Sequence, residues 1–380
     1  MIKSIYIDNF KALNDFKMEF QPLTLLIGAN SVGKSTVLQA LELLAYFTKG
    51  KEFGELNNYL KERGWSAKDL RSNLSRKRHI TFRVEFELEE SIFEWEIILT
   101  ITENGFELIK ESVIEGKKKH LWSHNESTFV LDDDDDDTLY LIRKPFTSST
   151  LSFFDGYINP KLSRIKNYLN NLALFDFSST EQLKSRNLIV KNAQIGRNGE
   201  NLAAYLHQLS KEELVNLTTQ LQTYAPFFET INIRKRSRNE VEIDIKEKFS
   251  NNRIDAQHLS DGMMRLLAIL TLALTESGYS TMMIEEIEDG INPNLAGEVI
   301  KTLTKVTQET NRQFILTTHN PLILDWVDVA SIHFLYRDKK GFVKQKTFNE
   351  LPTVLQNLDY MNPGEIWINF DKDELIQDNE

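Results

Sequence analysis

The sequence predicts an α/β fold with a mainly parallel core sheet, an inserted antiparallel β lobe and a helical subdomain. Three observations support this fold class. A glycine-rich loop at 28–35 lies between an apolar run and an amphipathic segment, and apolar runs alternate with helical periodicity over 258–336. Between these regions, residues 79–142 alternate polar and apolar side chains, which is typical of antiparallel strands with one solvated face.

The first 50 residues contain three predicted strands and one predicted helix. Residues 2–7 and 16–20 alternate apolar and polar side chains, whereas 23–27 is continuously apolar, as expected of a strand covered on both faces. After the loop GANSVGKST, the segment VLQALELLAYF carries apolar residues at helical spacing. This region therefore predicts a strand, a loop and a helix that belong to the core sheet.

The middle of the chain predicts two different units. Over 79–142 we expect about five antiparallel strands, with one turn at the six aspartates Asp132 to Asp137, whose mutual repulsion should keep that tip solvated. Metal binding and mimicry of a phosphate chain are the alternatives for this run. Residues 155–225 are predicted to be mostly helical, with two further strands at 229–235 and 240–247.

The last third of the chain, 258–336, alternates between helices and short apolar strands, which predicts a parallel sheet with crossover helices. The domain organisation that we expect follows from these segments. It consists of a P-loop core (1–50 and 255–345), an inserted antiparallel β lobe (51–150), a helical subdomain with strands leading to the next motif (151–254) and a C-terminal tail (346–380).

The composition excludes several classes of protein. There is no cysteine, so disulfides, iron–sulfur clusters, thiolate zinc sites and cysteine nucleophiles are excluded. The N-terminus has no secretory pattern and no run approaches the roughly 20 apolar residues of a membrane span, so we expect a cytoplasmic protein with no membrane partner. The net charge of -11, from 45 basic and 56 acidic residues, argues against a wholly basic surface but allows a local basic patch.

The segment from Gly28 to Ser35 matches the phosphate-binding pattern GxxxxGK[ST] at every fixed position, and the alternative is an ordinary glycine-containing turn. Its glycines let backbone N–H groups curl around an anion at a helix N-terminus. Lys34 is expected to reach the β and γ phosphates, and Ser35 to offer its hydroxyl to Mg²⁺. The loop therefore predicts a site for ATP and Mg²⁺, with these candidate binding residues: Asn30, Ser31, Val32, Gly33, Lys34, Ser35 and Thr36.

Three further segments carry polar residues at predicted element ends. Glu285 and Glu286 follow the apolar run TMMI, where one carboxylate can hold Mg²⁺ and the next can orient the attacking water. Taken alone, two such acids are more often a solvated strand end. Ser260 begins a long apolar helix, either as its N-cap or as a phosphate ligand. His319 follows the strand QFILTT and should emerge at the same sheet edge as Glu286, although a lone histidine there is more often structural.

Read in order, these motifs resemble the ATP-binding-cassette ATPase heads of the RecF/SMC type. The resemblance is closest to the ATPase domain of OLD-family proteins and related phage-defence ATPases. It rests on NFK at 9–11, GANSVGKST, LSDGMMRLLAIL, MMIEEIEDGINP and TTHNPLIL, and it covers roughly 1–50 and 195–335. The glutamine that usually reports on Mg²⁺ in this group has no clear counterpart, and Gln182 is the candidate.

The resemblance implies an enzyme that hydrolyses ATP to ADP and phosphate. Carried over by position, Glu285 is the Mg²⁺-side acid together with Ser35, and Lys34 binds phosphate. Glu286 is the catalytic base, and His319 is the sensor of the γ-phosphate.

The resemblance also implies a partner arrangement. Two heads close face to face around ATP in this group, so we expect a homodimer or a higher homo-oligomer. Ser260 and Gly262 would then contact the nucleotide held by the opposite subunit, and Lys11 of the NFK element would contact nucleotide as well.

The work that ATP drives is open to several interpretations. We expect an ATPase coupled to nucleic-acid-associated work or to control of an effector in phage defence. The alternatives are a DNA repair or recombination ATPase, and an ATP-dependent scaffold that sequesters a toxin or nuclease. Basic clusters at 76–78, 117–119 and 234–236 could neutralise DNA or RNA phosphates. The 44 residues after Tyr336 are too few for the Toprim domain of OLD nucleases, so a nuclease or toxin should be a separate polypeptide.

Overall fold

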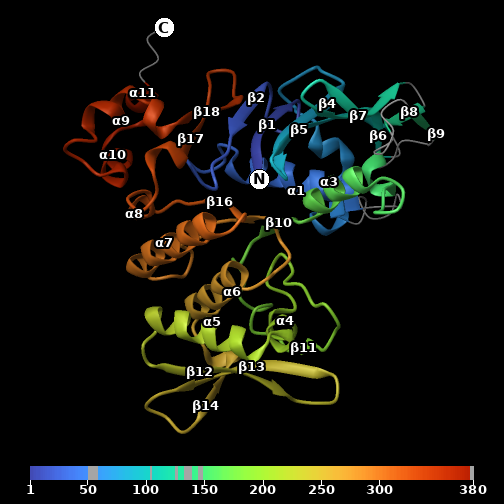
Figure 1. The fold of residues 1–380 in the computed structure, drawn as a ribbon. Coiled ribbons are helices and arrows are strands. Elements are labelled where there is room, and N and C mark those ends of the chain that lie inside the picture. Colours follow the sequence, from blue (N-terminus) through green and yellow to red (C-terminus); the bar gives the residue numbers. More distant parts are fainter. Residues whose placement is uncertain (50–58, 103–104, 125–126, 132–138, 144–148, 377–380) are drawn as a thin grey trace.

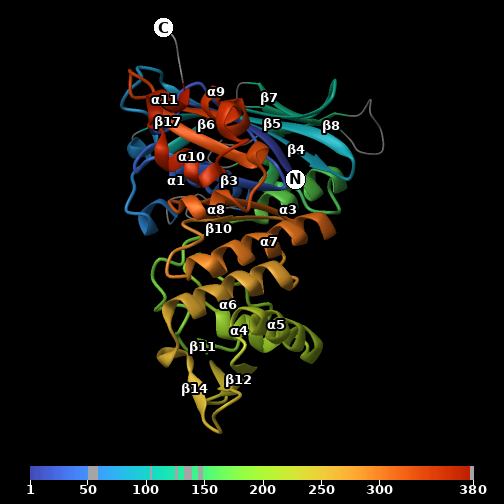
Figure 2. The same ribbon diagram turned by 90° about the vertical axis from the view of Figure 1, so that its left-hand side faces the viewer.

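The computed structural model describes residues 1–49, 59–102, 105–124, 127–131, 139–143 and 149–376. Its elements stack in layers (Figure 1, Figure 2). An antiparallel sheet packs on helices α1 (Lys34–Lys49) and α3 (Pro160–Asn170), which cover one face of the core sheet. Helices α6 (Asp261–Leu274) and α7 (Pro293–Glu309) cover its other face. The aspartates Asp132 to Asp137 lie outside the described residues.

The core sheet is mainly parallel, as the sequence predicts. Its strand order is β10-β15-β16-β3-β17-β18, in which β18 runs antiparallel to β17 and the other pairs are parallel. Every residue of β3, β15 and β16 is buried, because helices cover both faces of the sheet. The bounds are β3 (Leu23–Ile27), β10 (Leu172–Phe175), β15 (Thr281–Ile284), β16 (Gln313–Thr317), β17 (Ile332–Arg337) and β18 (Val343–Thr347).

The antiparallel sheet has eight strands in the order β2-β1-β4-β5-β6-β7-β8-β9. It differs from the prediction in two ways: β7 adds a strand after Gly116, and β1 and β2, assigned above to the core segment 1–50, pair here. Their inward apolar side chains, such as Ile5 and Phe16, belong to the core that contains α1. The bounds are β1 (Ile2–Asp8), β2 (Phe16–Glu19), β4 (His79–Leu88), β5 (Ser91–Thr102), β6 (Gly105–Glu115), β7 (Lys118–His124), β8 (Ser127–Leu131) and β9 (Leu139–Arg143).

The segment predicted as a helical subdomain is split between two places. Helix α3 and strand β10, which was predicted as helix, lie with the core sheet. The remainder forms the lower part of Figure 1, where α4 (Leu202–Gln208) and α5 (Lys211–Tyr224) cover one face of a four-stranded sheet. Its strands are β11 (Asn187–Leu188), β12 (Phe228–Lys235), β13 (Glu240–Glu247) and β14 (Arg253–Asp255). The predicted strands at 229–235 and 240–247 are confirmed.

The residues after β18 fold into helices that pack beside the core sheet, in the upper left of Figure 1. They are α9 (Pro352–Asn357), α10 (Pro363–Asn369) and α11 (Lys372–Ile376), and α10 contacts the short helix α8 (Pro321–Leu324). Five 3₁₀ helices complete the described chain: Ala67–Leu70, Thr150–Phe153, Ala256–His258, Val329–Ser331 and Phe348–Glu350. Within the described ranges, no helix is long and apolar enough to cross a membrane.

Candidate nucleotide-binding site

The glycine-rich loop joins β3 to α1, as the sequence predicts. Gly28 and Gly33 adopt φ angles of 137° and 115°, which disfavour any residue with a side chain. A Cβ on Gly28 would also lie 2.3 Å from the carbonyl oxygen of Leu335 on β17. Ser31, at the exposed part of the loop, has a φ of 61°. Asn30 and Ser35 are exposed, whereas Val32 is buried. The two glycines therefore permit the tight loop that a phosphate-binding helix start requires.

Lys34 lies at the first position of α1, and its ammonium group is held by the loop. Its Nζ donates to the carbonyl oxygens of Gly28 and Ala29 at 2.8 and 3.1 Å. Burial lowers the pKa of Lys34 to about 8, although the nearby Glu286 and Glu288 favour its charged form. A bound anion would favour the ammonium form further, so the loop and its lysine form an electropositive cradle.

Ser35 and Glu285, the predicted Mg²⁺ ligands, meet at the edge of the core sheet where its parallel strands end. Glu285 follows β15, and its carboxylate accepts a hydrogen bond from the Ser35 side chain, which lowers its pKa. Burial outweighs this effect and raises the pKa of Glu285, and the nearby Asp176 and Glu42 add to the rise. A buried carboxylate beside a hydroxyl and two further acids is a site whose charge favours a divalent cation.

Glu286 and His319 also lie side by side at this edge. Glu286 has a φ of 47°, and its N–H donates to the hydroxyl of Thr317 at the end of β16 at 2.9 Å. Its carboxylate lies 3.9 Å from Nε2 of His319, and Glu288 accepts a hydrogen bond from the His319 N–H at 2.7 Å. The Glu286 side chain is 57% exposed, so it can reach a ligand or water outside the sheet edge.

The start of α6 packs against the turn that follows the two acids. Ser260 is the N-cap of α6 and accepts a hydrogen bond from the N–H of Met263 at 3.3 Å. A Cβ on Gly262 would lie 1.9 Å from the carbonyl oxygen of Gly290. Ser260 is exposed, and neither it nor Gly262 lines the cavity beside Ser35, considering the described part of the chain. Its capping role is therefore realised within one chain.

A cavity of about 270 Å³ lies between the loop, the strand ends and α6. It combines carboxylates with an apolar wall, and its lining residues are Ser35, Asp176, Phe177, Ser178, Arg265, Ile269, Ile284, Glu285, Glu286, Ile287 and Asp289. The structure thus brings four of these groups, Ser35, Asp176, Glu285 and Glu286, to one space beside the phosphate loop.

Comparison with protein families gives one match that decides the class of the chain. The family described as "AAA domain, putative AbiEii toxin, Type IV TA system" matches residues 23–325. The chain belongs to this AAA domain family. The match spans the phosphate loop, Glu285, Glu286 and His319. No curated protein sequence matches the chain.

Two solved structures similar to this AAA domain are heads of SMC proteins. The SmcHead bound to the C-winged helix domain of ScpA is 12% identical, with a TM-score of 0.59, over 91% of this chain and 96% of that one. The Smc head domain with an extended coiled coil bound to the C-terminal domain of ScpA, derived from Pyrococcus furiosus, is 11% identical, with a TM-score of 0.56, over 94% and 99%. These similarities show the fold, and they confirm the predicted SMC/RecF-like head.

Two predicted residues of the AAA domain have partners that the motifs did not indicate. The Nζ of Lys11 donates to Gln39 on α1 at 2.8 Å and lies 3.2 Å from the ring centre of Trp65. Gln182 is exposed, and Asp176, directly after β10, lines the cavity next to Glu285 instead. The candidate Gln182 therefore does not line the cavity that contains Glu285.

Two arginines near the site of the AAA domain were missed because neither lies in a recognisable motif. Arg337, at the end of β17, donates to the carbonyl oxygen of Ser31 through Nε and Nη2 at 3.0 and 2.8 Å. Arg197 lies in the loop before α4 and forms an ion pair with Glu285 at 3.2 Å. Only knowledge of the complete chain topology could have shown that these two arginines lie near the site.

Proposed function

We propose that the chain is an ATPase that binds ATP with Mg²⁺, dimerises around it and controls a separate effector protein in cytoplasmic phage defence. The observation that carries this proposal is the convergence of Ser35, Glu285, Glu286 and His319 beside a phosphate-binding loop. These are the groups that phosphoryl transfer to water requires.

The residues of the site fit ATP and Mg²⁺. Positions 28 and 33 of the loop leave no room for a side chain, and the helix start faces the space that phosphates would fill. In the part of the chain that is described, no three His, Asp or Glu side chains are grouped as a metal site, so Ser35 and Glu285 would hold Mg²⁺ weakly by themselves and phosphate oxygens would complete its coordination. Bound Mg²⁺ would supply positive charge that offsets the charge of the phosphates.

In this proposal, each residue of the nucleotide-binding site has one task. The Lys34 ammonium group would leave its loop carbonyls and bind the β and γ phosphates, while Ser35 and Glu285 would hold Mg²⁺. Glu286, which is exposed and ionisable, would orient the attacking water and accept its proton. His319, 3.9 Å from Glu286, would contact the γ-phosphate.

The exposed start of α6 supports dimerisation through ATP. Ser260 and Asp261 are exposed, and the N–H groups of a helix start favour an anion. Because Ser260 lies outside the cavity of its own chain, the nucleotide that it contacts would be held by a second copy. Closed heads would form a homodimer or a higher homo-oligomer.

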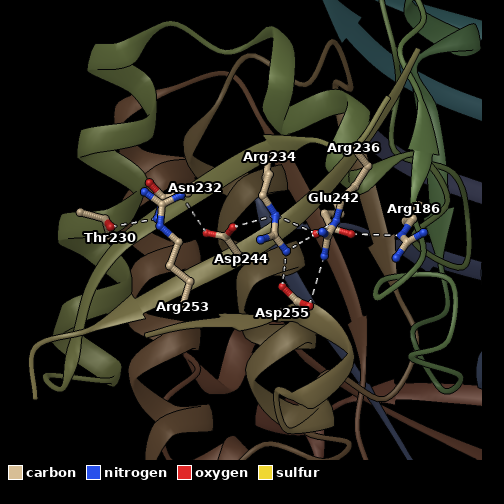
Figure 3. A network of polar contacts seen from close by, with 9 residues as sticks. All are labelled: Arg186, Thr230, Asn232, Arg234, Arg236, Glu242, Asp244, Arg253 and Asp255. Carbon is tan, nitrogen blue, oxygen red and sulfur yellow. Dashed lines mark hydrogen bonds and ion pairs between the residues drawn. The ribbon is translucent and has the colours of Figure 1, made fainter. Parts of the chain in front are cut away.

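An internal charge network favours a protein effector over nucleic acid as the main partner. The cluster at 234–236 is paired within the chain: Arg234 contacts Glu242 and Asp255, and Arg236 contacts the same two acids (Figure 3). Arginines held by carboxylates neutralise few phosphates. The family description includes a toxin–antitoxin system, which supports a toxin or nuclease as the effector. A repair ATPase working on DNA or RNA, and an ATP-dependent scaffold that sequesters such a partner, are the alternatives.

Two variants test the proposal. Lys34→Ala should abolish ATP binding in calorimetry, because a methyl group cannot replace the ammonium group. Glu286→Gln should bind ATP but hydrolyse it at least about 100-fold more slowly, and ATP should then double its mass in light scattering. Wild-type ATP affinity in Lys34→Ala would reject the nucleotide site, and an unchanged mass for Glu286→Gln would reject dimerisation.

The effector is identified by purifying Glu286→Gln with ATP from its native host. Co-purification of a nuclease or toxin supports the defence proposal, and DNA with recombination proteins supports repair. Lys34→Ala, purified in parallel, is the control, because a partner that depends on the closed dimer should be absent from that preparation.

A further inference from the structure

Arg197 is surrounded by the acids that line the metal side of the candidate site. Its Nη2 lies 3.2 Å from Oε2 of Glu285 and 3.7 Å from Oδ2 of Asp176, and its Nη1 lies 3.4 Å from Oε2 of Glu42. The Arg197 side chain is 21% exposed. One guanidinium group therefore faces three carboxylates, two of which line the cavity beside Ser35.

The loop that carries Arg197 is held in a defined conformation. The carbonyl oxygen of Arg197 accepts a hydrogen bond from the N–H of Asp176 at 2.9 Å. Glu200 accepts hydrogen bonds from the backbone N–H and the side-chain amide of Asn198, both at 2.9 Å. Gly199, with a φ of 88°, closes the turn through its N–H to Gly196 at 3.0 Å. This loop therefore positions the guanidinium group at the carboxylates.

In the metal-free site, a positive charge is needed to offset the mutual repulsion of the carboxylates around Arg197. Asp176, Glu285 and Glu42 all lie within 3.7 Å of the same guanidinium group, so their carboxylates repel one another when no cation is present. Arg197 offsets that repulsion and keeps the acids together. A divalent cation at the same carboxylates would repel the guanidinium group, because two cations a few ångströms apart interact strongly in a partly buried site.

We propose, on the basis of the ATPase function proposed above, that Arg197 is a positioning residue that occupies the place of the metal charge. It holds Asp176 and Glu285 in the metal-free site and moves toward Glu42 when Mg²⁺ binds with nucleotide. The contact between Nη1 and Glu42 already exists at 3.4 Å, so this partner is in place for the displaced side chain. Arg197 thus sets how strongly nucleotide binding depends on Mg²⁺.

The matched control is Arg63. It forms an ion pair with Glu42, and its side chain is 13% exposed, compared with 21% for Arg197. Its described ion pair is with Glu42 and not with Asp176 or Glu285, although its charge also acts on Glu285 from a greater distance. Arg63→Gln therefore removes one positive charge from the same neighbourhood without removing a direct ion-pair partner of Asp176 or Glu285.

The first measurement compares the Kd for AMPPNP in EDTA with that in excess Mg²⁺, by calorimetry. The ratio of the two constants should rise about tenfold in Arg197→Gln, and should stay within about threefold of wild type in Arg63→Gln and Arg197→Lys. An unchanged ratio in Arg197→Gln, or an equal rise in Arg63→Gln, would overturn the proposal. A fall in the ratio would also overturn it, because it would show that Arg197 acts with the metal rather than against it.

The second measurement uses Mn²⁺ alone, followed by the loss of its free signal in electron paramagnetic resonance. Arg197→Gln should bind Mn²⁺ about tenfold more tightly than wild type and Arg63→Gln. Equal Mn²⁺ affinity in all three proteins would contradict the proposal. Because no nucleotide is present, this result does not depend on ATP binding, and a failure of the ATPase proposal is recognised separately by the absence of AMPPNP binding.

Discussion

Arg265 is the side chain whose loss should disturb the site most, because it joins three segments that meet at the cavity. Its Nε donates to the carbonyl oxygen of Phe177 and its Nη2 to that of Ser178, both at 2.7 Å. Its Nη1 forms an ion pair with Asp289 at 2.7 Å. Helix α6, the turn after Glu286 and the segment after β10 are thus tied to one guanidinium group.

The exposure of each partner of Arg265 determines how much that contact contributes to the free energy of unfolding. Asp289 is 46% exposed, so its ion pair should contribute only about 0–1 kcal/mol. The two hydrogen bonds from the charged group to carbonyl oxygens should contribute about 1.5–3 kcal/mol each. Arg265→Ala is therefore expected to lower the free energy of unfolding by about 3–6 kcal/mol, and Asp289→Asn by less than about 1 kcal/mol.

Urea denaturation of both single variants and the double variant measures these quantities. The coupling energy between Arg265 and Asp289 should be below about 1 kcal/mol. Arg265→Lys, which keeps the charge but lacks the guanidinium geometry, should recover less than half of the loss. If Asp289→Asn destabilised the protein as much as Arg265→Ala, the stability would reside in the ion pair and this reasoning would be refuted.

Three further predictions follow from individual sites. The pKa of Lys34 is lowered to about 8, so ATP affinity measured by calorimetry should be constant below pH 8 and fall about tenfold per pH unit above it; a flat profile to pH 9.5 would contradict this. Gly262→Ala places a Cβ 1.9 Å from the Gly290 carbonyl oxygen, so it should cost about 1–3 kcal/mol in urea denaturation and abolish ATP-dependent dimerisation while AMPPNP affinity is kept. Arg234→Ala removes a partner of the fully buried Asp244 and should cost about 3 kcal/mol, whereas a loss below about 0.5 kcal/mol would show that the network is dispensable.

The local part of the site could be predicted from the sequence, because its motifs are contiguous. Lys34 and Ser35 lie in one loop pattern, and Glu285 and His319 each end an apolar strand. Parallel strands present their carboxyl ends at one edge, so the meeting of these residues followed from the strand pattern alone. Strand positions sufficed because β15 and β16 are fully buried and therefore mostly apolar in sequence.

The parts that could not be predicted depend on contacts between distant segments. Strand β10 is a four-residue apolar run after a helix, which periodicity cannot distinguish from a helical continuation. Strands β1 and β2 alternate in the manner of a half-buried sheet, but the pairing of β1 with β4 across more than 70 residues leaves no local signal. Arg197 lies in a loop and Arg337 is the last residue of β17, and no spacing indicates what a side chain at either position will face.

The position of β3 has a consequence for the synthesis of the protein. This strand carries the phosphate loop, and its two neighbours in the sheet are β16 and β17, so 286 residues separate its last residue, Ile27, from the first residue of β16, Gln313. At translation rates of about 5–20 residues per second, a completed β3 waits on the order of 15–60 s for its partners. During that time a strand with four apolar residues out of five is unpaired, so the nascent chain should depend on chaperones, and no ATP site can form on the ribosome before β16 emerges.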